Sequence, residues 1–351
     1  MKRSALSSAA SMLALACVLT TCGKNTPPAA TEKAPEPEAA KPVAAAASPA
    51  KPAEKPAEMP QKVVAPAKAA GHEAVFATPA VELNGFGSDE PLERADEPTR
   101  GVIHVASKDL QRMSAAHWEQ FDCTNFTAKR WGRYEVRLTY KLNHATLGTQ
   151  FRFGQQAMKK TLTASSQPRR VAYGTVYIEK PGTYPFVLYI ASSGAESGIE
   201  IHDVAFVPAP EGPTPSQNGD GSIVLDASSA TTWSENMRYE PKPEKNCLGF
   251  WTSVDDFAEW QFDVAKPGRY KVALVQGCGA GSGGSEVAVR VGKQELKFTV
   301  QDTGGFQNWK EVQVGEVEIG DKGLQRLVVD PVSKTGAAVL DVHKVVLTPA
   351  G

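Results

Sequence analysis

The sequence is poor in histidine and lacks the motifs by which many enzymes are recognised. Its six histidines include no HxxxH pair, a spacing typical of zinc sites. No Gly-x-Ser-x-Gly nucleophile elbow is present. The formal charge is −1, from 38 basic and 39 acidic side chains, which excludes a strong nucleic-acid footprint. No apolar run reaches the roughly 18 residues of a membrane-spanning helix. We therefore expect a protein that is not an enzyme, with no nucleic-acid partner and no resident cofactor.

Residues 24–70 contain no aromatic side chain. Ten Pro, 16 Ala and 12 charged residues fill 38 of these 47 positions. Such a composition buries too little apolar surface to offset the entropy of ordering the chain. We expect a disordered linker over residues 23–98, which either spaces the folded part from an anchor or is a tail without that role.

The first 22 residues have the order of a secretory signal peptide. Lys2 and Arg3 precede an apolar stretch over residues 5–19, and small polar residues lead to Cys22. The ending LTTCG resembles a bacterial lipobox, with Cys17 as a second candidate position. The resemblance implies lipidation at Cys22 and a membrane-anchored lipoprotein of the cell envelope, in the periplasm or on the outer-membrane face. Simple secretion and an uncleaved anchor stay open as alternatives.

From about residue 99 the sequence alternates in the manner of β-strands. Short runs rich in Val, Ile, Tyr and Phe are separated by turn residues at intervals of roughly 8–12 residues, which is typical of antiparallel sandwiches. In residues 134–140 and 270–276 the first, third and fifth positions are apolar, and a period of two places them on one face. No comparable stretch keeps a helical apolar period for three turns. We predict an all-β fold with little helix.

The two halves of this region resemble each other. Gly132-Arg133-Tyr134 recurs as Gly268-Arg269-Tyr270, and residues 171–184 and 201–208 recur 141 residues later. A repeat of this length indicates a duplicated domain. Pro, Gly, Ser, Asn and Asp accumulate near residues 208–221, which marks the joint. We predict two tandem antiparallel β-sandwich modules, residues 99–210 and 219–351.

The second module carries a family resemblance. Its motifs, in chain order, are Leu225-Asp226-Ala227, Gly249-Phe250-Trp251, residues 255–260 (DDFAEW), Pro267-Gly268-Arg269-Tyr270 and residues 303–309 (TGGFQNW). They resemble carbohydrate-binding modules of families 6 and 35, which have a galactose-binding-like jelly-roll fold. The Gly-rich segment 276–285 looks like that of accessory modules attached to bacterial sulfatases and fucosidases. The resemblance implies a jelly roll that binds sugars in loops at one end or on a sheet face.

The resemblance also implies a set of binding residues. Sugars stack their C–H faces on aromatic rings and hydrogen-bond through their hydroxyls. The related modules place stacking rings at Phe250 or Trp251 and at Phe306, with Gln307 and Asn308 as hydrogen-bonding side chains. The alternative is that these residues only cap one end of the sandwich. Trp260 alternates with Phe262 and Val264 along a strand, so we place it in the core.

Two further features have less support in the sequence. Related modules hold a structural calcium through acidic residues near the first and last strands, where this chain has Asp226 and Asp341. Carboxylate oxygens suit such a hard cation. Cys247 and Cys278 share a module, and an oxidising envelope permits a disulfide between them. Free buried thiols are the alternative.

Two patterns imitate catalytic or cofactor motifs. Gly279, Gly281 and Gly284 match G-x-G-x-x-G formally, but a dinucleotide site needs a helix after the loop, and residues 286–291 alternate as a strand. Asp255, Asp256 and Glu259 could suggest paired glycosidase carboxylates. We interpret them as a solvated strand face or turn.

Three functional classes are compatible with these observations. The first is a non-catalytic, envelope-anchored lipoprotein that binds polysaccharide or another glycan. The second is a structural or adhesive envelope protein that contacts protein or cell-wall partners. The third is an accessory subunit of a polysaccharide-degrading sulfatase or glycosidase complex.

Overall fold

The computed structural model describes residues 97–351, apart from residues 116 and 192–195 and the side chains of residues 144 and 145. The signal peptide, Cys22 and nearly all of the linker lie outside the described residues. The helices of the described part are two three-residue 3-10 turns, Ser107–Asp109 and Ala227–Ser229, and the remaining regular structure is strand. The all-β prediction is thereby confirmed. Neither 3-10 turn has the length or the apolar character needed to cross a membrane.

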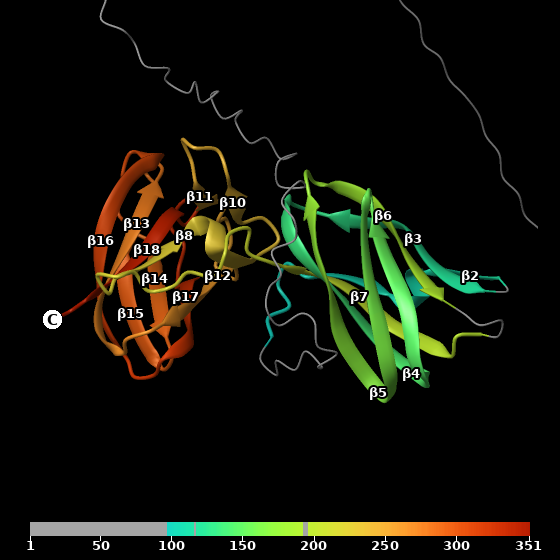
Figure 1. Ribbon diagram of the computed structural model, residues 1–351. Coiled ribbons are helices and arrows are strands. Elements are labelled where there is room, and N and C mark those ends of the chain that lie inside the picture. Colours follow the sequence, from blue (N-terminus) through green and yellow to red (C-terminus); the bar gives the residue numbers. More distant parts are fainter. Residues whose placement is uncertain (1–96, 116, 192–195) are drawn as a thin grey trace, which may run out of the picture. The chain divides into compact units, whose positions relative to one another are not determined.

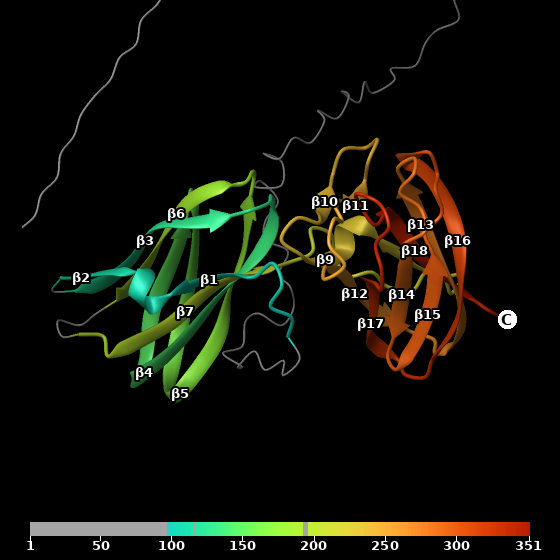
Figure 2. The same cartoon turned by 180° about the vertical axis from the view of Figure 1, so that it is seen from behind.

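The first sandwich is built from a single seven-stranded antiparallel sheet (Figures 1 and 2). Its strand order is β1-β7-β4-β6-β3-β2, with β5 paired to β4. The strands are β1 (Ile103–Ala106), β2 (Gln111–Ala115), β3 (Trp118–Ala128), β4 (Gly132–Phe153), β5 (Gln156–Ile178), β6 (Gly182–Ala191) and β7 (Ile199–Pro208).

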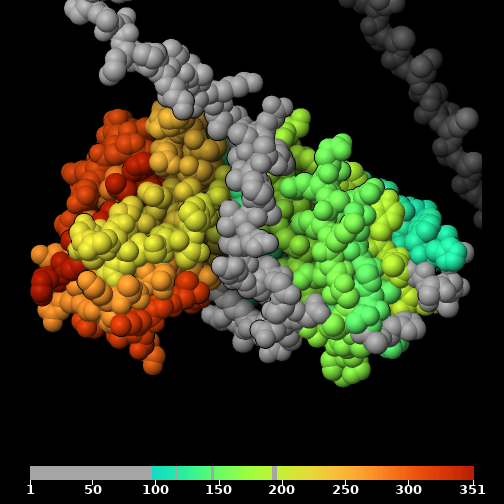
Figure 3. Space-filling view, viewed as in Figure 1, coloured from blue at the N-terminus to red at the C-terminus, as the bar shows by residue number. Residues whose placement is uncertain are grey.

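One sheet forms both layers because its two longest strands serve both. The first half of β4 pairs with β7, and its second half pairs with β6. Between these halves the β4–β5 register shifts from Tyr140 to Leu142 and again before Thr146. Such irregularities bend a strand and increase its twist. Figure 3 shows β4 and β5, in green, on the surface of this sandwich.

The second sandwich consists of two separate antiparallel sheets (Figure 1). One contains β10-β11-β18-β13-β16 with β8 paired to β18, and the other has the order β15-β14-β17-β12-β9. The strands are β8 (Ile223–Asp226), β9 (Ala230–Trp233), β10 (Arg238–Glu240), β11 (Cys247–Gly249), β12 (Phe257–Val264), β13 (Gly268–Cys278), β14 (Glu286–Val291), β15 (Gln294–Thr299), β16 (Gly305–Ile319), β17 (Gly323–Pro331) and β18 (Asp341–Pro349).

The duplication is visible in the strand registers. In the β4–β5 ladder one residue is bulged opposite Val136, beside Gly174, and the β13–β16 ladder has the same bulge opposite Val272, beside Gly315. The two glycines have φ values of 138° and 151°, a region that side chains disfavour. A bulge with a conserved place in both copies explains why the Gly recurs at this point of the repeat. The copies differ where β4 continues through the bend, because the second sandwich has the Gly-rich loop 279–285 there.

Each sandwich has its own core. Trp260, Phe262 and Val264 are buried in the second core, as the alternation predicted. The first core contains an aromatic cluster in which Phe126 stacks on Phe206 at 4.3 Å between ring centroids. Phe121 and Tyr173 also belong to the first core. Both lie within strands and are buried, since their places in β3 and β5 face the core.

Both sandwiches belong to one compact unit of the chain, and the turn between β3 and β4 contacts the second sandwich through polar groups. The buried Arg130 donates from Nε to the Ser234 carbonyl at 3.1 Å and from Nη2 to the Thr232 carbonyl at 3.0 Å. Trp131 donates its indole N–H to the Tyr239 carbonyl at 3.3 Å. Backbone carbonyls of the second sandwich thus accept bonds from the first.

We expect Phe206→Ala to lower the free energy of unfolding of the first sandwich by about 3–5 kcal/mol, because the fully buried ring would leave a cavity among four other aromatic rings. Met113→Ala, at a position that is 44% exposed, should change the free energy by about 0.5 kcal/mol or less. Chemical denaturation measures both. Similar losses in the two variants would contradict this account of the core.

Candidate functional site

The loop end of the second sandwich joins β13 to β14 and β15 to β16. Asp302 ties these two loops together, since its carboxylate accepts the backbone N–H of Gly281 and, at 2.8 Å, that of Gly304. These two bonds lower the pKa of Asp302. Thr335 adds a bond from its hydroxyl to the Gly283 carbonyl at 2.7 Å. The strand β14 follows the Gly-rich loop, so the G-x-G-x-x-G match lacks the helix that a dinucleotide needs, as predicted.

Phe306 lies at the start of β16 and is half-buried. A Cβ on Gly279 would come within 2.7 Å of its ring, and a Cβ on Gly277 would come within 2.0 Å of its carbonyl oxygen. The two glycines therefore allow β16 and the Phe306 ring to approach the end of β13 closely. The Phe306 ring can occupy this position only because Gly277 and Gly279 have no side chains.

A second aromatic group lies three residues further along β16. The half-buried Trp309 stacks on His343 with ring centroids 5.1 Å apart, and His343 Nδ1 lies 2.8 Å from the Asn246 carbonyl oxygen. Gln307 and Asn308 are exposed between the two aromatics in sequence. Gln307 donates to Asp341 at 3.4 Å, and Asn308 donates to the Thr303 carbonyl at 3.0 Å. Phe306, Gln307 and Asn308 are consecutive at the start of β16, and their joint role in binding stays a prediction.

The other predicted stacking pair is not available in the same way. Trp251 is fully buried and donates its indole N–H to the Asp256 carbonyl at 3.1 Å, so its stacking role is wrong. Phe250 is 42% exposed, but the Arg238 guanidinium lies 3.5 Å from its ring centroid. The edge of Trp131 approaches the same ring at 5.7 Å between centroids. Phe250 also has a φ of 60°, which costs backbone energy in a bulky residue. Its ring is held by Arg238 and Trp131 and is therefore not free to serve as a stacking surface for a sugar.

Arg238 itself contacts two aromatic rings. Its guanidinium carbon is 3.6 Å from the Trp131 centroid and 3.5 Å from the Phe250 centroid, and the two rings are nearly perpendicular to each other. Burial lowers the pKa of Arg238 to about 10, and nearby Glu240 opposes that shift. Cation–π contacts of this kind stabilise a desolvated guanidinium.

Three buried ionisable groups lie behind Gln307. Glu240, Cys247 and Asp341 bring one donor atom each within 4.8 Å of one another. The Cys247 thiol donates to Asp341 Oδ2 at 3.7 Å, and the Lys245 ammonium lies 2.5 Å from Glu240. Burial and the charge of Glu240 raise the pKa of Asp341 to about 7, and burial raises the pKa of Cys247. Because Lys245 already supplies a cation, we assign no metal site to this cluster.

The calcium pair that the resemblance implied is not assembled. Asp226 is paired with Lys344 in the register of β8 and β18, and Asp341 lies three residues along β18, about 10 Å away at strand spacing. Asp226 is exposed, whereas Asp341 is buried beside Cys247. These two carboxylates cannot share one ion at such a separation.

The disulfide expected between Cys247 and Cys278 is also contradicted, because both thiols are free and buried. The reason is that the two side chains point to opposite faces of their sheet. Cys278 belongs to the hydrophobic core, whereas Cys247 lies outside it, with its neighbour Leu248 pointing inward. The Cys247 sulfur contacts Asp341 instead.

The acidic group near β12 is not a solvated face. Asp255 is exposed, but Asp256 is completely buried and Glu259 is 3% exposed. Asp256 pairs with Arg100 at 2.6 Å, and Glu259 lies 3.6 Å from Arg326. The interpretation as a solvated face is wrong, since both carboxylates are used in ion pairs.

Sequence reasoning missed several members of this region. Glu240 and Lys245 were not singled out, although both closely precede Cys247, which was. Arg238 and Glu240 alternate around Tyr239, a period of two that places both on one face. His343 and Trp309 meet only through the pairing of β13 with both β16 and β18, which the sequence does not specify.

The family model described as "Domain of unknown function (DUF5077)" matches residues 229–350. No curated protein matches the chain. Among solved structures, the C-terminal CBM6 of LamC, a marine laminarinase from Zobellia galactanivorans, is 17% identical, with a TM-score of 0.28 and coverage of 36% of this chain and 98% of that one. CsCBM6-3 from Clostridium stercorarium in complex with cellobiose is 16% identical, with a TM-score of 0.29 and coverage of 40% and 99%.

A family 35 carbohydrate-binding module from Clostridium thermocellum is 12% identical, with a TM-score of 0.30 and coverage of 36% of this chain and 97% of that one. Larger enzymes are matched in part. The chain spans 30% of a GH26-CBM35 β-(1,4)-mannanase from Podospora anserina and 26% of a Paenibacillus xanthan lyase.

The raised pKa of Asp341 predicts a pH-dependent stability. The folded state holds the proton up to about pH 7, whereas the unfolded carboxyl has a pKa of 3.8. The proton on Asp341 therefore contributes on the order of 4 kcal/mol to the free energy of unfolding. This contribution is fully present below pH 3.8 and is lost as the pH rises to about 7. Asp341→Asn should unfold with nearly the wild-type free energy at pH 4 and should exceed it progressively toward pH 8.

Denaturant titrations across this pH range check the difference between the two proteins. Burial also raises the pKa of Glu211 to about 7, but that contribution is common to both and cancels. Asp321→Asn, at an exposed position after β16, is the control and should run parallel to the wild type. If Asp341→Asn also runs parallel, the assignment to Asp341 fails.

Proposed function

We propose that this chain is a non-catalytic, envelope-anchored lipoprotein that binds polysaccharide at the loop end of its second sandwich. The observation that carries the proposal is the half-exposed Phe306 ring, which is followed directly in the chain by the exposed amide side chains of Gln307 and Asn308. A ring of this kind stacks on the apolar face of a sugar, and amides exchange hydrogen bonds with its hydroxyls.

The sequence motifs support the same assignment. The segment 303–309 (TGGFQNW) resembles the loop of family 6 and 35 modules at which the stacking aromatic stands. The segment just before β18 offers no polar side chain to a sugar at Val339 or Leu340, because both are apolar and fully buried. Gln307 and Asn308 are therefore the hydrogen-bonding groups of the proposed site.

A non-catalytic role agrees with the acidic side chains of this sandwich. The carboxylates that could have formed a glycosidase pair, Asp256 and Glu259, are held in ion pairs with Arg100 and Arg326. A general acid or base needs a carboxyl group that can reach the substrate. Presentation of polysaccharide to hydrolases or sulfatases of the same envelope is the role that follows, and a structural or adhesive role is the alternative.

We expect Phe306→Ala to weaken binding of a neutral polysaccharide about tenfold, because the stacking platform is removed. A glycan array identifies the polysaccharide, and titration calorimetry with that polysaccharide measures the affinity. Leu324→Ala, at a 63% exposed position of β17 in the other sheet, is the matched control. Equal affinities of Phe306→Ala and the wild type would discard the site, and a protein that retains no glycan would favour the structural role.

The proposed anchoring predicts the mature N-terminus. Expressed in a bacterium with a lipoprotein-processing pathway, the protein should begin at Cys22 and carry acyl chains on it. Two or more chains give stable membrane attachment, whereas one gives only reversible attachment. Mass spectrometry of the N-terminal peptide measures this, with Cys22→Ser as the unlipidated control. An unmodified peptide that begins elsewhere would contradict the anchor.

A further inference from the structure

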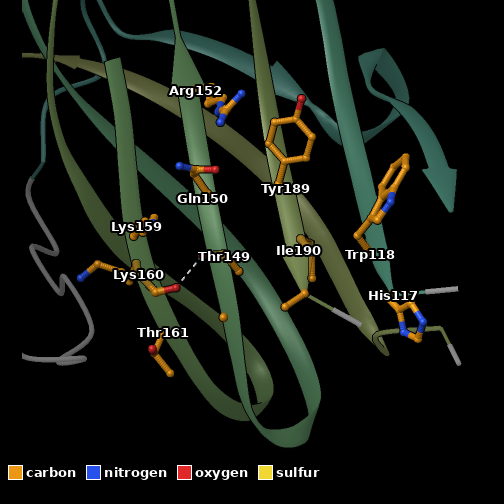
Figure 4. A pocket seen from close by; sticks show the side chains of 12 residues that line it. His117, Trp118, Thr149, Gln150, Arg152, Lys159, Lys160, Thr161, Tyr189 and Ile190 are labelled. Carbon is orange, nitrogen blue, oxygen red and sulfur yellow. Dashed lines mark hydrogen bonds between the residues drawn. The ribbon is translucent and has the colours of Figure 1, made fainter. Parts of the chain in front are cut away.

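The first sandwich has a concavity of about 730 Å³ on the face of β3, β4, β5 and β6 (Figure 4). Its lining includes the aromatic Trp118 and Tyr189, the polar Gln150, and the basic Arg152, Lys159 and His117, and it contains no Asp or Glu. Trp118 is 41% exposed. The Arg152 guanidinium lies 5.2 Å from the Tyr189 ring centroid.

The strand registers place these side chains on one outer face. Tyr189, Gln150 and Lys159 are direct cross-strand partners. Trp118 is paired with Ala191, two residues along β6 from Tyr189, and Arg152 is paired with Val187, two residues along in the other direction. Residues two apart on a strand share a face. The rings and the basic groups therefore form one surface rather than separate exposed side chains.

The second sandwich contains the same hairpin in the same place. Residues 148–161 and 286–299 pair with identical register across two-residue turns, and Gly154 and Gly292 in these turns have φ values of 56° and 58°. Arg152 pairs with Val187, and Arg290 pairs with Val328. Arg290 is therefore the counterpart of Arg152, and Lys297 is the counterpart of Lys159.

The two copies differ in what neutralises these bases. Arg290 forms ion pairs with Glu295, at 2.8 Å, and with Asp330. Lys297 lies 3.3 Å from Glu286. In the second sandwich, three carboxylates therefore surround the two basic side chains.

The register shows what stands at the carboxylate positions in the first sandwich. Ala157 replaces Glu295, Tyr189 replaces Asp330 and Gly148 replaces Glu286. Within the part of the chain that the structure describes, no ion pair of Arg152 or Lys159 is found. The backbone of the hairpin is kept, the bases are kept, and their counter-charges are replaced by a ring and two small residues.

We propose that this concavity binds an anionic saccharide, with its carboxylate or sulfate group on Arg152 and Lys159. A guanidinium donates two parallel hydrogen bonds to such a group. Tyr189 and Trp118 provide rings for the sugar faces, and Gln150 lies between them and Lys159 as a partner for hydroxyls. The proposal rests on the proposed function for the saccharide class of the ligand, but it concerns a separate site on the other sandwich.

A single-stranded nucleic acid also combines negative charge with stacking bases. The saccharide is favoured because the formal charge of the whole chain is −1, which gives no overall attraction to a phosphate backbone. The concavity places its basic groups beside two aromatic rings. This suits a ligand that combines an anionic group with the apolar faces of sugar rings.

The test uses the full chain in titration calorimetry with polygalacturonate, dextran sulfate and uncharged dextran. We expect binding of one of the two anionic polymers, which identifies carboxylate or sulfate, and weakening with added salt. Ala157→Glu should reduce that affinity about tenfold or more, because the new carboxylate would pair with Arg152 as Glu295 does with Arg290. Ala157 is exposed, and the same register accepts Glu in the second copy, so the fold should tolerate it.

The matched control is Arg290→Gln, which removes the equivalent base from the second sandwich and should leave the affinity unchanged. The proposal is overturned if neither anionic polymer binds, if Ala157→Glu binds as the wild type does, or if Arg290→Gln loses as much affinity. It is also overturned if a single-stranded oligonucleotide binds more tightly than both polymers and Ala157→Glu removes that binding. Phe306→Ala separates the two sites, since it should reduce binding of the neutral polysaccharide only.

Discussion

The structure depends on cross-strand register, because a sheet that buries one face fixes the outward direction of every second side chain. A slip of one residue would exchange the faces. In both sandwiches the bulges beside Gly174 and Gly315 set the register of the long central strands at the same point. Everything that faces solvent, including Gln307 at one end and Arg152 on the other sandwich, takes its position from these ladders. The outer faces are then free to differ while the cores stay alike.

Much of the fold was accessible from the sequence for this reason. The alternation of Trp260, Phe262 and Val264 gave their burial, and the recurrence of Gly-Arg-Tyr at 132 and 268 gave the starts of equivalent strands. Period two says which residues share a face of a strand, but it does not say what covers that face. Asp256 was therefore expected in solvent, although Arg100 covers it. The long bent strands β4 and β5 were hidden for another reason, since Asn143 and Gly148 in β4 and Pro168 in β5 are typical turn residues, and yet both strands continue through them.

The candidate site was predictable only in part. Phe306, Gln307 and Asn308 are contiguous, so a loop motif was enough to place them together. Trp251 differs from its neighbour Phe250 in environment, since Phe250 has a φ of 60° and is 42% exposed whereas Trp251 is fully buried, which composition cannot show. The thiols of Cys247 and Cys278 lie on opposite sides of one sheet, and a disulfide between them was excluded by facing rather than by distance along the chain. Contacts such as Trp309 on His343 join strands that are far apart in sequence.

The outer hairpins show how two copies of one fold can differ in surface charge at low cost. A surface ion pair contributes only about 0–1 kcal/mol to folding, so the loss of the carboxylates at positions 148, 157 and 189 would scarcely destabilise the first sandwich. The loss exposes the full charge of Arg152 and Lys159, and a charge-assisted hydrogen bond to a ligand in a concavity is worth more than one in open solvent. The same exchange in the core would leave a buried base unpaired, at a cost of several kcal/mol. Divergence between the copies is therefore expected on the outer faces of the sheets, where the hairpins 148–161 and 286–299 differ in charge but not in register.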